Sequence, residues 1–582
     1  MESRRLPFDV APSSLFAHPA DKLVKPLDPL LVRLFFREQL RRSIPREEQS
    51  AAEFARRLLA NLSIGASISA ADRARIPRKG AAVIVANHPF GFLEGLLLLD
   101  LLERIRPDYR IVANHVLADV AALAERMILV NAFDERAPGE NRRAVRRCVE
   151  FLEAGGLLVL FPAGEVSHLD WNERAVVDPR WNPAAARFAR KAGCPVVPLF
   201  FVGSNSPAFQ LAGTIHPRLR TLNLLNELCK KSNQQIEIRT GTPVTAATLR
   251  RFENSRAAAD YLRARTYLLR NRSAEPGEKP LRHGFRRARP LAPAVAPEVL
   301  ERELEALPPE CLLAQNTEFR VYGARAEQIP ETLLEIGRCR EQTYREVGEG
   351  TGRGRDLDRF DAYYQHILLW HGKDRRVAGA YRLVATPDVL PKRGIAGLYS
   401  STLFRYQPEF FASIGPAVEL GRSFVCREYQ RHYAPLLLLW KGILAHLARR
   451  PECGVLFGAV SMSSDYQPLS RTLLFNFLDG HVSHDARCWV RPRRAFRQSI
   501  GTPKHVEQLS RLLPSVEELS ASLADIEAGG KGVPVLIRQY LKAGGRLLGF
   551  NVDRKFANAL DVLVMADLRT ARACELVARA GG

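Results

Sequence analysis

The 582-residue chain lacks any long hydrophobic run. Its longest uncharged apolar stretches, such as residues 96–99 and 435–440, are far shorter than the roughly 20 residues that a membrane-spanning helix needs. The first residues, MESRRLPFDVAPSS, are basic, but no apolar segment follows them, so we expect neither a signal peptide nor a transmembrane helix. If the protein meets a membrane, we expect it to lie on the surface.

Paired cysteines are absent as well. Nine cysteines are scattered along the chain, and none of them forms a C-x-x-C pair. This pattern argues against a disulfide framework and against a zinc site, and it favours reduced thiols in a cytosol. We therefore expect a cytoplasmic protein with no bound metal.

Acidic residues are in short supply relative to basic ones. Lys and Arg total 85 against 63 Asp and Glu, which gives a formal charge of +22. Such an excess favours an anionic partner, either nucleic acid, a phospholipid surface or an acidic carrier protein. Basic residues are interspersed with acids, and we find neither zinc-finger spacing nor an aromatic-rich RNA-binding signature, so nucleic acid is the least favoured of the three.

Strand and helix patterns alternate in the first half of the chain. Apolar runs with strand character are followed by amphipathic helical patterns at a steady rhythm. This alternation predicts an α/β domain whose largely parallel sheet is covered on both faces. The expected strands are residues 81–87, 109–114, 157–164 and 194–203, and the expected helices are residues 92–105, 142–155 and 182–193.

Composition divides the chain into five parts. Residues 1–62 contain two amphipathic, Arg-bearing patterns (28–40 and 54–64), which either pack at a domain edge or lie in a membrane interface. The first α/β domain spans 63–270, and a Pro- and Arg-rich linker follows at 271–297. A second α/β domain covers 298–495, and residues 496–582 are expected to form a small, mainly helical appendage.

The first candidate site follows the strand at 81–87. Asn87 and His88 end the strand, Pro89 and Gly91 force a turn, and Glu94 falls in the first turn of the next helix. An imidazole at a strand end can take a proton from a hydroxyl group when a carboxylate fixes its tautomer. Taken alone, the same residues also fit a structural turn with Glu94 favouring the helix dipole.

Three segments in order resemble the glycerolipid acyltransferases of the PlsC type. They are NHPFGFLEG (87–95), FPAGEVS (161–167) and VVPLF (196–200), within a resemblance that covers roughly residues 60–245. The resemblance implies an O-acyltransferase in which His88 is the general base and Glu94 orients it. The residues implied to form the acceptor site are Asn87, Gly91, Phe161, Pro162, Gly164, Glu165 and Ser167.

This segment departs from the PlsC pattern at three positions. Glu94 stands where the family has an Asp one residue earlier, Ala163 replaces a glutamate, and Val166 replaces an arginine. The family's recognition of a phosphate head group therefore does not carry over. Such changes are those expected of the hemolysin-like branch, whose acceptors need not be glycerol phosphates.

A second candidate site lies between residues 338 and 432. Asp356, Asp358 and Asp361 surround a Gly-Arg loop, where they either hold an ammonium group or neutralise nearby arginines. Further on, a basic turn that contains Arg427 and Arg431 precedes an apolar helix, and a helix N-terminus of this kind suits phosphate.

This half resembles the GNAT-like N-acyltransferases that use acyl carrier protein (ACP). The stretches that carry the resemblance are FDAYYQHILLW, VAGAYRL, ELGRSFVCREYQR and VLFGAVS, within about 320–480. The resemblance implies attack of a neutral amine on a thioester, with Glu419 as the base and Arg422 holding a substrate carboxylate. Arg427 and Arg431 would face the phosphopantetheine of the carrier. The alternative for Glu419 and Arg422 is a structural ion pair.

Together the two halves resemble the bifunctional ornithine-lipid synthases. That resemblance implies N-acylation of the ornithine α-amine by the second half and O-acylation of the new 3-hydroxyl by the first. It further implies acyl-ACP as donor, no resident cofactor, an amino-acid substrate and a peripheral position on the cytoplasmic face of the inner membrane.

Other functions remain as alternatives. The main one is a lysophospholipid acyltransferase fused to a GNAT-like domain that acylates another amine, such as glycine or lysine. A non-enzymatic lytic protein would need a spanning or pore-forming segment, and the sequence shows none.

Overall fold

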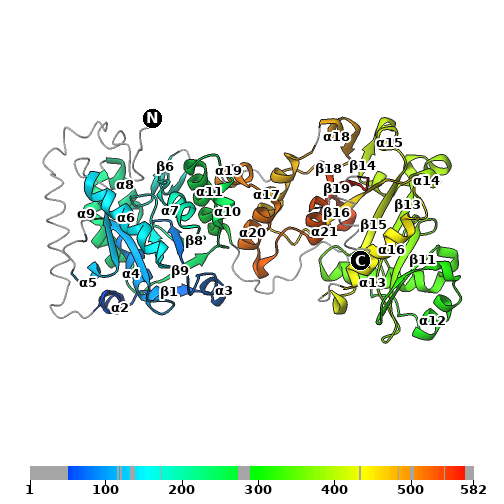
Figure 1. The fold of residues 1–582 in the computed structure, drawn as a ribbon, viewed down its shortest axis with the longest axis horizontal. Coiled ribbons are helices and arrows are strands. Elements are labelled where there is room, and N and C mark those ends of the chain that lie inside the picture. The colour runs from blue at the N-terminus through cyan, green and yellow to red at the C-terminus, as the bar shows by residue number, and fades with distance from the viewer. Residues whose placement is uncertain are drawn as a thin grey trace. The chain divides into compact units, whose positions relative to one another are not determined.

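The computed structural model describes residues 50–114, 117, 121–130, 138–171, 173–215, 217–272, 289–430, 434–482, 484–498, 504–542 and 544–569. The chain divides into two compact units (Figure 1). Unit 1 comprises Met1–Ala274 and Pro503–Gly532, and unit 2 comprises Glu275–Thr502 and Val533–Gly582. The expected helix at 28–40 and most of the expected linker at 271–297 lie outside the described residues.

Unit 1 is built on a seven-stranded sheet in the order β1-β9-β8-β2-β5-β3-β4. The strands from β8 to β4 are all parallel, and β9 and β1 run the other way at one edge, because β9 pairs antiparallel with β8. The predicted α/β fold is confirmed. The strands are β1 (Gly65–Ile68), β2 (Ala82–Ala86), β3 (Tyr109–Asn114), β4 (Met127–Val130), β5 (Leu157–Leu160), β8 (Val196–Phe201) and β9 (Gln235–Thr240).

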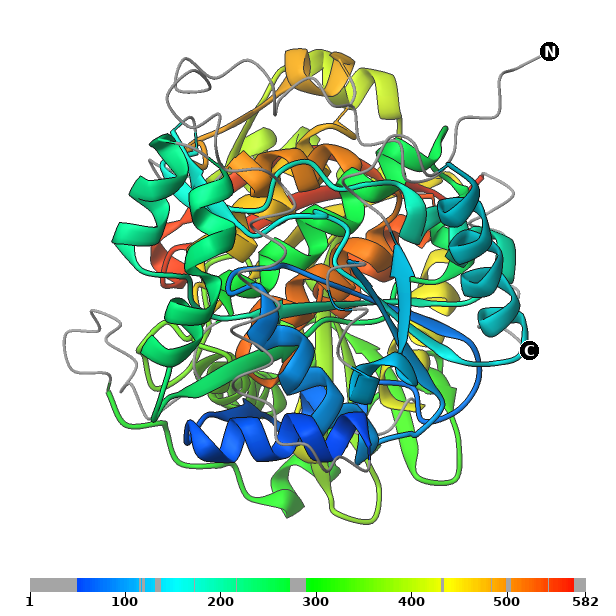
Figure 2. The ribbon, with the colours of Figure 1, turned by 90° about the vertical axis from the view of Figure 1, so that its left-hand side faces the viewer.

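Helices cover both faces of this sheet (Figure 2). On one face α4 packs against α2 and α9, and on the other α7 and α11 pack against β2 and β8. Every residue of β2 is buried, as expected for a strand covered on two sides. The main helices of the unit are α2 (Ala51–Asn61), α4 (Phe92–Glu103), α6 (Pro138–Glu153), α7 (Ala184–Ala192), α8 (Pro207–Ile215), α9 (Pro217–Lys230) and α11 (Ser255–Leu268).

Helix α2 is one of the two amphipathic patterns expected near the N-terminus. Its Ser50 cap accepts a hydrogen bond from the Glu53 N–H, and its apolar residues Phe54, Ala55 and Leu59 are buried in the core that includes α4. For this helix the structure favours domain packing over an interfacial position, because the apolar face is already covered by protein.

Unit 2 is built on an eight-stranded sheet in the order β10-β11-β12-β13-β15-β16-β19-β18. All neighbours are antiparallel except β15 and β16, which are parallel. Helices α13 (Pro330–Glu346) and α16 (Ala434–Leu447) pack on the sheet. The strands are β10 (Leu312–Gln315), β11 (Phe319–Ala324), β12 (Gln365–His371), β13 (Arg376–Ala385), β15 (Ala417–Val425), β16 (Val455–Met462), β18 (Arg546–Asp553) and β19 (Ala559–Asp567).

The segment 496–582, predicted to be mainly helical, contains α19 (Lys504–Leu512), α20 (Val516–Ile526) and α21 (Val535–Lys542), but its last two strands were not predicted. β19 pairs with β16 from Val455 to Met462 and with β18 on its other side, so both strands complete the second sheet. Residues 559–567 form a run buried on both faces, and such a short apolar run cannot be told from a buried helix by its periodicity.

In the sequence, the segment Pro503–Gly532 separates the two parts of unit 2 and belongs to unit 1. Helix α20 carries Glu518 and Asp525, which both form ion pairs of 2.9 Å with Arg265 of α11. Arg265 is fully buried, and Asp525 also pairs with Arg75 at 3.1 Å. The segment 503–532 is therefore part of unit 1, although it follows most of unit 2 in the sequence.

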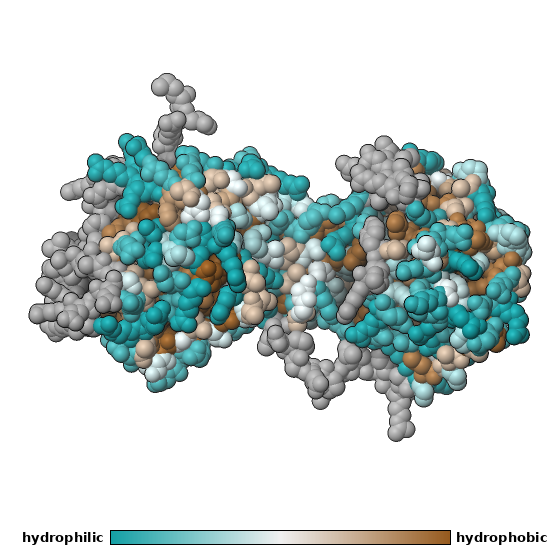
Figure 3. Space-filling view, turned by 60° about the horizontal axis from the view of Figure 1, so that its bottom comes forward, coloured by the Kyte–Doolittle hydropathy of each residue, from teal (hydrophilic) through white to brown (hydrophobic). Residues whose placement is uncertain are grey.

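No helix in the described ranges is long and apolar enough to cross a membrane. On the face drawn in Figure 3, hydrophilic residues cover most of the described surface, with hydrophobic residues in small separate groups.

Candidate active sites

The first site is formed where β2 ends. The Asn87 side chain donates to the Phe201 carbonyl at 3.0 Å and accepts from the Phe201 N–H at 2.7 Å, which holds the end of β2 against β8. Gly91 has a φ of +94° and precedes α4, and a Cβ there would lie 2.8 Å from Leu224. The tight turn therefore depends on glycine. Asn87 and Gly91 shape the turn that presents His88.

His88 and Glu94 meet as the sequence predicted. His88 Nδ1 lies 3.4 Å from Glu94 Oε1, and the same oxygen accepts the Phe90 N–H at 2.6 Å. Glu94 is fully buried, whereas the His88 side chain is 19% exposed. Since Nδ1 faces the carboxylate, Nε2 is the nitrogen left to face a substrate, and no hydrogen bond to it is formed within the described residues.

The charges around His88 determine its pKa. Burial alone would lower the pKa, but the attraction of Glu94, and then of Asp178, outweighs burial and raises it above the ordinary value. The carboxylates thus favour the protonated ring, which is the form that a general base acquires when it takes a proton from a hydroxyl.

Asp178 is a buried residue of this site that the sequence patterns did not reveal. Its Oδ1 accepts the backbone N–H of His88 at 3.1 Å and a short hydrogen bond from Ser167 Oγ, while Oδ2 accepts Trp181 Nε1 at 2.8 Å. The Ser167 N–H in turn donates to the His88 carbonyl at 2.8 Å. The peptide groups of His88 are therefore fixed by Asp178 and Ser167.

The remaining residues of the predicted acceptor site have different surroundings. The Phe161 ring stacks on the His88 ring at a centroid distance of 4.5 Å. Pro162 is buried, whereas Gly164, with a φ of +72°, and Glu165 are exposed on the turn that follows β5. Phe161 thus supports the imidazole, and Gly164 and Glu165 form the exposed part of the turn.

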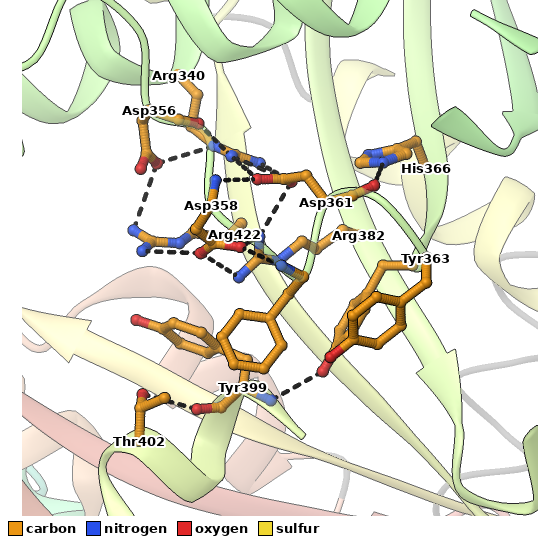
Figure 4. A network of polar contacts seen from close by, with 12 residues as sticks. Arg340, Asp356, Asp358, Asp361, Tyr363, His366, Arg382, Tyr399, Thr402 and Arg422 are labelled. Carbon is orange, nitrogen blue, oxygen red and sulfur yellow. Dashed lines mark hydrogen bonds and ion pairs between the residues drawn. The ribbon is translucent and has the colours of Figure 1, made fainter. Parts of the chain in front are cut away.

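The second site contains an ion-pair ring of three arginines and three aspartates (Figure 4). Its closest ion pairs measure 2.7–3.0 Å, and the two formed by Arg422 are longer, 3.3 and 3.6 Å. Because every aspartate already has an arginine partner, the idea that these carboxylates hold a substrate ammonium group is corrected in favour of neutralisation. The members are Arg340, Arg382, Arg422, Asp356, Asp358 and Asp361.

Glu419 lies on β15 and is 1% exposed. One oxygen accepts from the Tyr364 hydroxyl and from the Tyr399 N–H at 2.9 Å, and the other accepts from the Ser400 N–H at 2.7 Å. The carboxylate therefore anchors the turn at Tyr399 and Ser400. Its partners are these groups and not Arg422, so the expected alternative of an ion pair between the two is not what the structure shows.

Arg422 occupies an irregular part of β15. It has a φ of +52°, which is uncommon for a residue with a side chain, and it lies where the pairing with β13 shifts in register. Shortly before Arg422, β15 pairs in parallel with β16. This pairing joins Ala417–Glu419 to Val455–Phe457, although β15 extends to Val425 and β16 to Met462. The two strands are thus not paired with each other beyond Glu419.

The described residues include one of the two arginines of the predicted phosphate-binding turn. Arg427 is exposed in the short helix Arg427–Tyr429, shortly before α16, and Arg431 lies outside the described residues. No group of three or more His, Cys, Asp or Glu side chains placed to hold a metal ion occurs within the described ranges.

Two protein-family models match the chain. A model described as "Acyltransferase" matches residues 46–276, and one described as "Acetyltransferase (GNAT) domain" matches residues 339–441. The first range contains His88, Glu94 and Asp178, and the second contains the ion-pair ring, Glu419 and Arg422. The chain combines an acyltransferase domain with a GNAT domain, as the sequence motifs predicted.

The chain is similar to curated proteins of two descriptions, one an N-acyltransferase and the other an O-acyltransferase. The chain is 30% identical over 297 residues to a glycine N(alpha)-acyltransferase of Bacteroides thetaiotaomicron, a match that covers 46% of this chain and 87% of that protein. A protein of the same description from Phocaeicola vulgatus is 26% identical and covers 46% and 85%. A lyso-glycine lipid O-acyltransferase of P. vulgatus is 25% identical and covers 33% and 70%.

Proposed function

This chain is a bifunctional acyltransferase that belongs to the family of the B. thetaiotaomicron glycine N(alpha)-acyltransferase, and on that premise we propose that it makes an aminolipid, ornithine lipid. Unit 2 N-acylates the α-amine of ornithine with a 3-hydroxyacyl group. Unit 1 then esterifies the 3-hydroxyl. The observation that carries the proposal is the buried Glu94 carboxylate that faces Nδ1 of His88 and leaves Nε2 for a hydroxyl.

In the O-acylation step, His88 Nε2 removes the proton of the lipid 3-hydroxyl as its oxygen attacks the thioester carbonyl. A C–O bond forms, the C–S bond breaks, and the proton passes to the departing thiolate. Glu94 stabilises the imidazolium during this transfer, and Asp178 holds the His88 backbone. General-base assistance of this type contributes about 10²–10⁴-fold to a rate.

In the N-acylation step, a neutral amine attacks the thioester of the acyl donor, so that an amide forms and a thiol leaves. Beyond Glu419, β15 and β16 are not paired with each other, and the backbone N–H and C=O groups of such a gap suit the amide-bearing arm of a phosphopantetheine. Arg422 lies at the same place and suits the carboxylate of the amino-acid substrate.

Acyl-ACP is the donor in this proposal. Carrier proteins of this kind are acidic, and a chain with a formal charge of +22 attracts them over a distance of about a Debye length. The same charge favours an anionic bilayer surface, so the protein acts as a peripheral enzyme at the cytoplasmic face of the inner membrane. The mono-acylated intermediate is amphipathic and stays at that surface between the two steps.

Glycine is the second candidate for the acceptor amino acid. The relatives named for glycine and for lyso-glycine lipid favour it, and the same two steps would then yield a glycine lipid.

Product analysis in a host without aminolipids tests the proposal. Cells expressing the intact chain are expected to contain a phosphorus-free, ninhydrin-positive lipid that releases ornithine on hydrolysis, detected by mass spectrometry. The variant His88→Ala is expected to accumulate the N-(3-hydroxyacyl) amino acid without the ester. Release of glycine selects the second candidate, and new phosphatidic acid without an aminolipid overturns both.

A further inference from the structure

The second sheet carries polar side chains on one face of three adjacent strands. Ser461 of β16 lies opposite Asp561 of β19, which lies opposite Asn551 of β18. Opposite residues of antiparallel strands share a face, and so do residues two apart on one strand, so Asp553 belongs to the same face. Glu349, in the loop after α13, accepts a hydrogen bond of 2.7 Å from Ser461 Oγ. We call Glu349, Asp553 and Asp561 the acidic row.

The acidic row is buried, and its carboxyl groups form no ion pair in the described part of the chain. Glu349, Asp553 and Asp561 are 6%, 7% and 5% exposed, and none of them forms an ion pair there. Asp561 accepts a long hydrogen bond of 3.4 Å from Asn551. Buried carboxylates are normally paired, because an unpaired buried charge is costly.

The pKa values of the row agree with this lack of an ion pair. Burial, and then the neighbouring Asp553, raises the pKa of Asp561 well above its ordinary value, and Glu349 adds to the effect. Burial also raises the pKa of Glu349 to about 7. A cation bound at the row would reverse these effects, because an opposite charge favours the ionised carboxylate.

Arg422 provides a second observation that points to a ligand at the same place. Its side chain is 9% exposed, its Nε is buried without a hydrogen-bond partner, and its ion pairs with the aspartates of the ring are the longest there (Figure 4). The guanidinium lies over the rings of Tyr399 and Phe556, and its charge acts on both Asp561 and Glu349. A buried donor that lacks an acceptor suits a substrate carboxylate.

Charge complementarity selects the class of ligand. The aspartates of the ring are paired with its three arginines, which leaves the acidic row as carboxyl groups that can ionise when a cation binds beside them. An amino acid with a second amine matches this distribution, because it combines one carboxylate with a cationic side chain. Glycine has no group to place at the row. A metal ion is disfavoured, because no set of ligands placed to hold one occurs in the described ranges.

We infer that the acidic row binds the cationic side chain of a diamino-acid acceptor, while Arg422 binds its carboxylate. The inference rests on the proposed N-acylation and adds the residues that choose the acceptor. Asp553 is the last residue of β18, and Phe556 lies in the connection between β18 and β19. The hairpin formed by these two strands therefore acts as a specificity element of the GNAT-like unit.

The test compares acceptors that differ in side-chain charge. The purified full chain is given a 3-hydroxyacyl-ACP with ornithine, lysine, glycine or norvaline, which is an uncharged analogue of ornithine, and kcat/KM for amide formation is measured. We expect ornithine and lysine to exceed norvaline and glycine by at least about tenfold, as for other charge-assisted contacts. Asp561→Asn is expected to remove most of this preference while norvaline changes by less than about threefold.

Two further variants make the outcome decisive. Glu349→Gln retains an acceptor for Ser461 and should weaken the same preference, which covers the case in which Asp561→Asn fails to fold. Asp388→Asn, at a half-exposed aspartate paired with Arg450 in the same unit, should leave the preference intact. Equal use of ornithine and norvaline by the unaltered protein, or an equal loss with every acceptor in the variants, overturns the inference. Amide formation with none of the four acceptors refutes the proposed N-acylation itself.

Discussion

Two buried carboxylates act on His88 through different atoms. Glu94 faces ring nitrogen Nδ1, whereas Asp178 accepts the backbone N–H and acts on the ring by its charge. Glu94 lies six positions from His88, so one turn brings the two together and the sequence predicts the pair. Asp178 is 90 positions away in a segment without a motif, and its contact depends on the packing of the whole unit.

Asp178→Asn is expected to lower the pKa of His88. The substitution removes a negative charge that favours the imidazolium and retains an oxygen for the His88 N–H. Since the general base must be neutral, the acidic limb of the pH profile of O-acylation should move to lower pH. The profile of kcat/KM against pH measures this shift. Ser167→Ala is the control, because it removes one partner of Asp178 and leaves its charge, and an unmoved limb in Asp178→Asn would contradict the prediction.

The variant Glu419→Gln tests whether Glu419 anchors the turn at Tyr399 and Ser400 or acts as the general base of N-acylation. Glu419 accepts hydrogen bonds from Tyr364, Tyr399 and Ser400, so we expect the substitution to destabilise unit 2 by about 1–3 kcal/mol. Urea-dependent proteolysis measures the loss, and exposed Glu409→Gln serves as the control. A variant of unchanged stability whose N-acylation loses its acidic limb would instead identify Glu419 as the base.

At the scale of elements, local patterns predicted the alternating strands and helices of unit 1. The β18–β19 hairpin was missed, because β19 gains its identity from pairing with β16, about a hundred positions earlier. The ion-pair ring shows the same limit. Its aspartates are conspicuous in the sequence, but Arg340 and Arg382 come from α13 and β13.

Removal of the hairpin should separate the two activities. A chain that ends at Gly532 retains all of unit 1 but exposes the edge of β16 along Val455–Met462. Because an unpaired apolar edge promotes aggregation, we expect N-acylation to be lost. Esterification of supplied N-(3-hydroxyacyl) ornithine should persist if unit 1 remains in solution. Assays of both steps after sedimentation check this, with a chain that ends at Arg569 as control, and full N-acylation by the shorter chain would contradict it.

At the scale of the whole molecule, the two units are interleaved in the sequence. Unit 1 needs the segment 503–532, whose Glu518 and Asp525 pair with the buried Arg265. A cut at the linker therefore does not release an intact first unit, although it is where composition alone places the boundary.

The fragment 1–272 is expected to be less stable than unit 1 of the full chain by about 3–5 kcal/mol, because it leaves Arg265 buried without its carboxylates. A peptide spanning 504–532 should raise its melting temperature when added in trans. The same peptide with Asp525→Asn should restore less of the stability. A fragment that melts like the full chain, or that ignores the peptide, would show that the segment is dispensable.

Interleaving also governs how the protein is made. Domains generally fold from the N-terminus as they leave the ribosome. Here, however, residues 275–502 must be synthesised before the segment that neutralises Arg265 emerges, and the second sheet waits for its last strand at Ala559–Asp567. Unit 1 is not complete until Gly532 has been synthesised, and the second sheet is not complete until Asp567 has been synthesised. A prematurely terminated nascent chain that stops before Pro503 therefore yields neither unit in complete form.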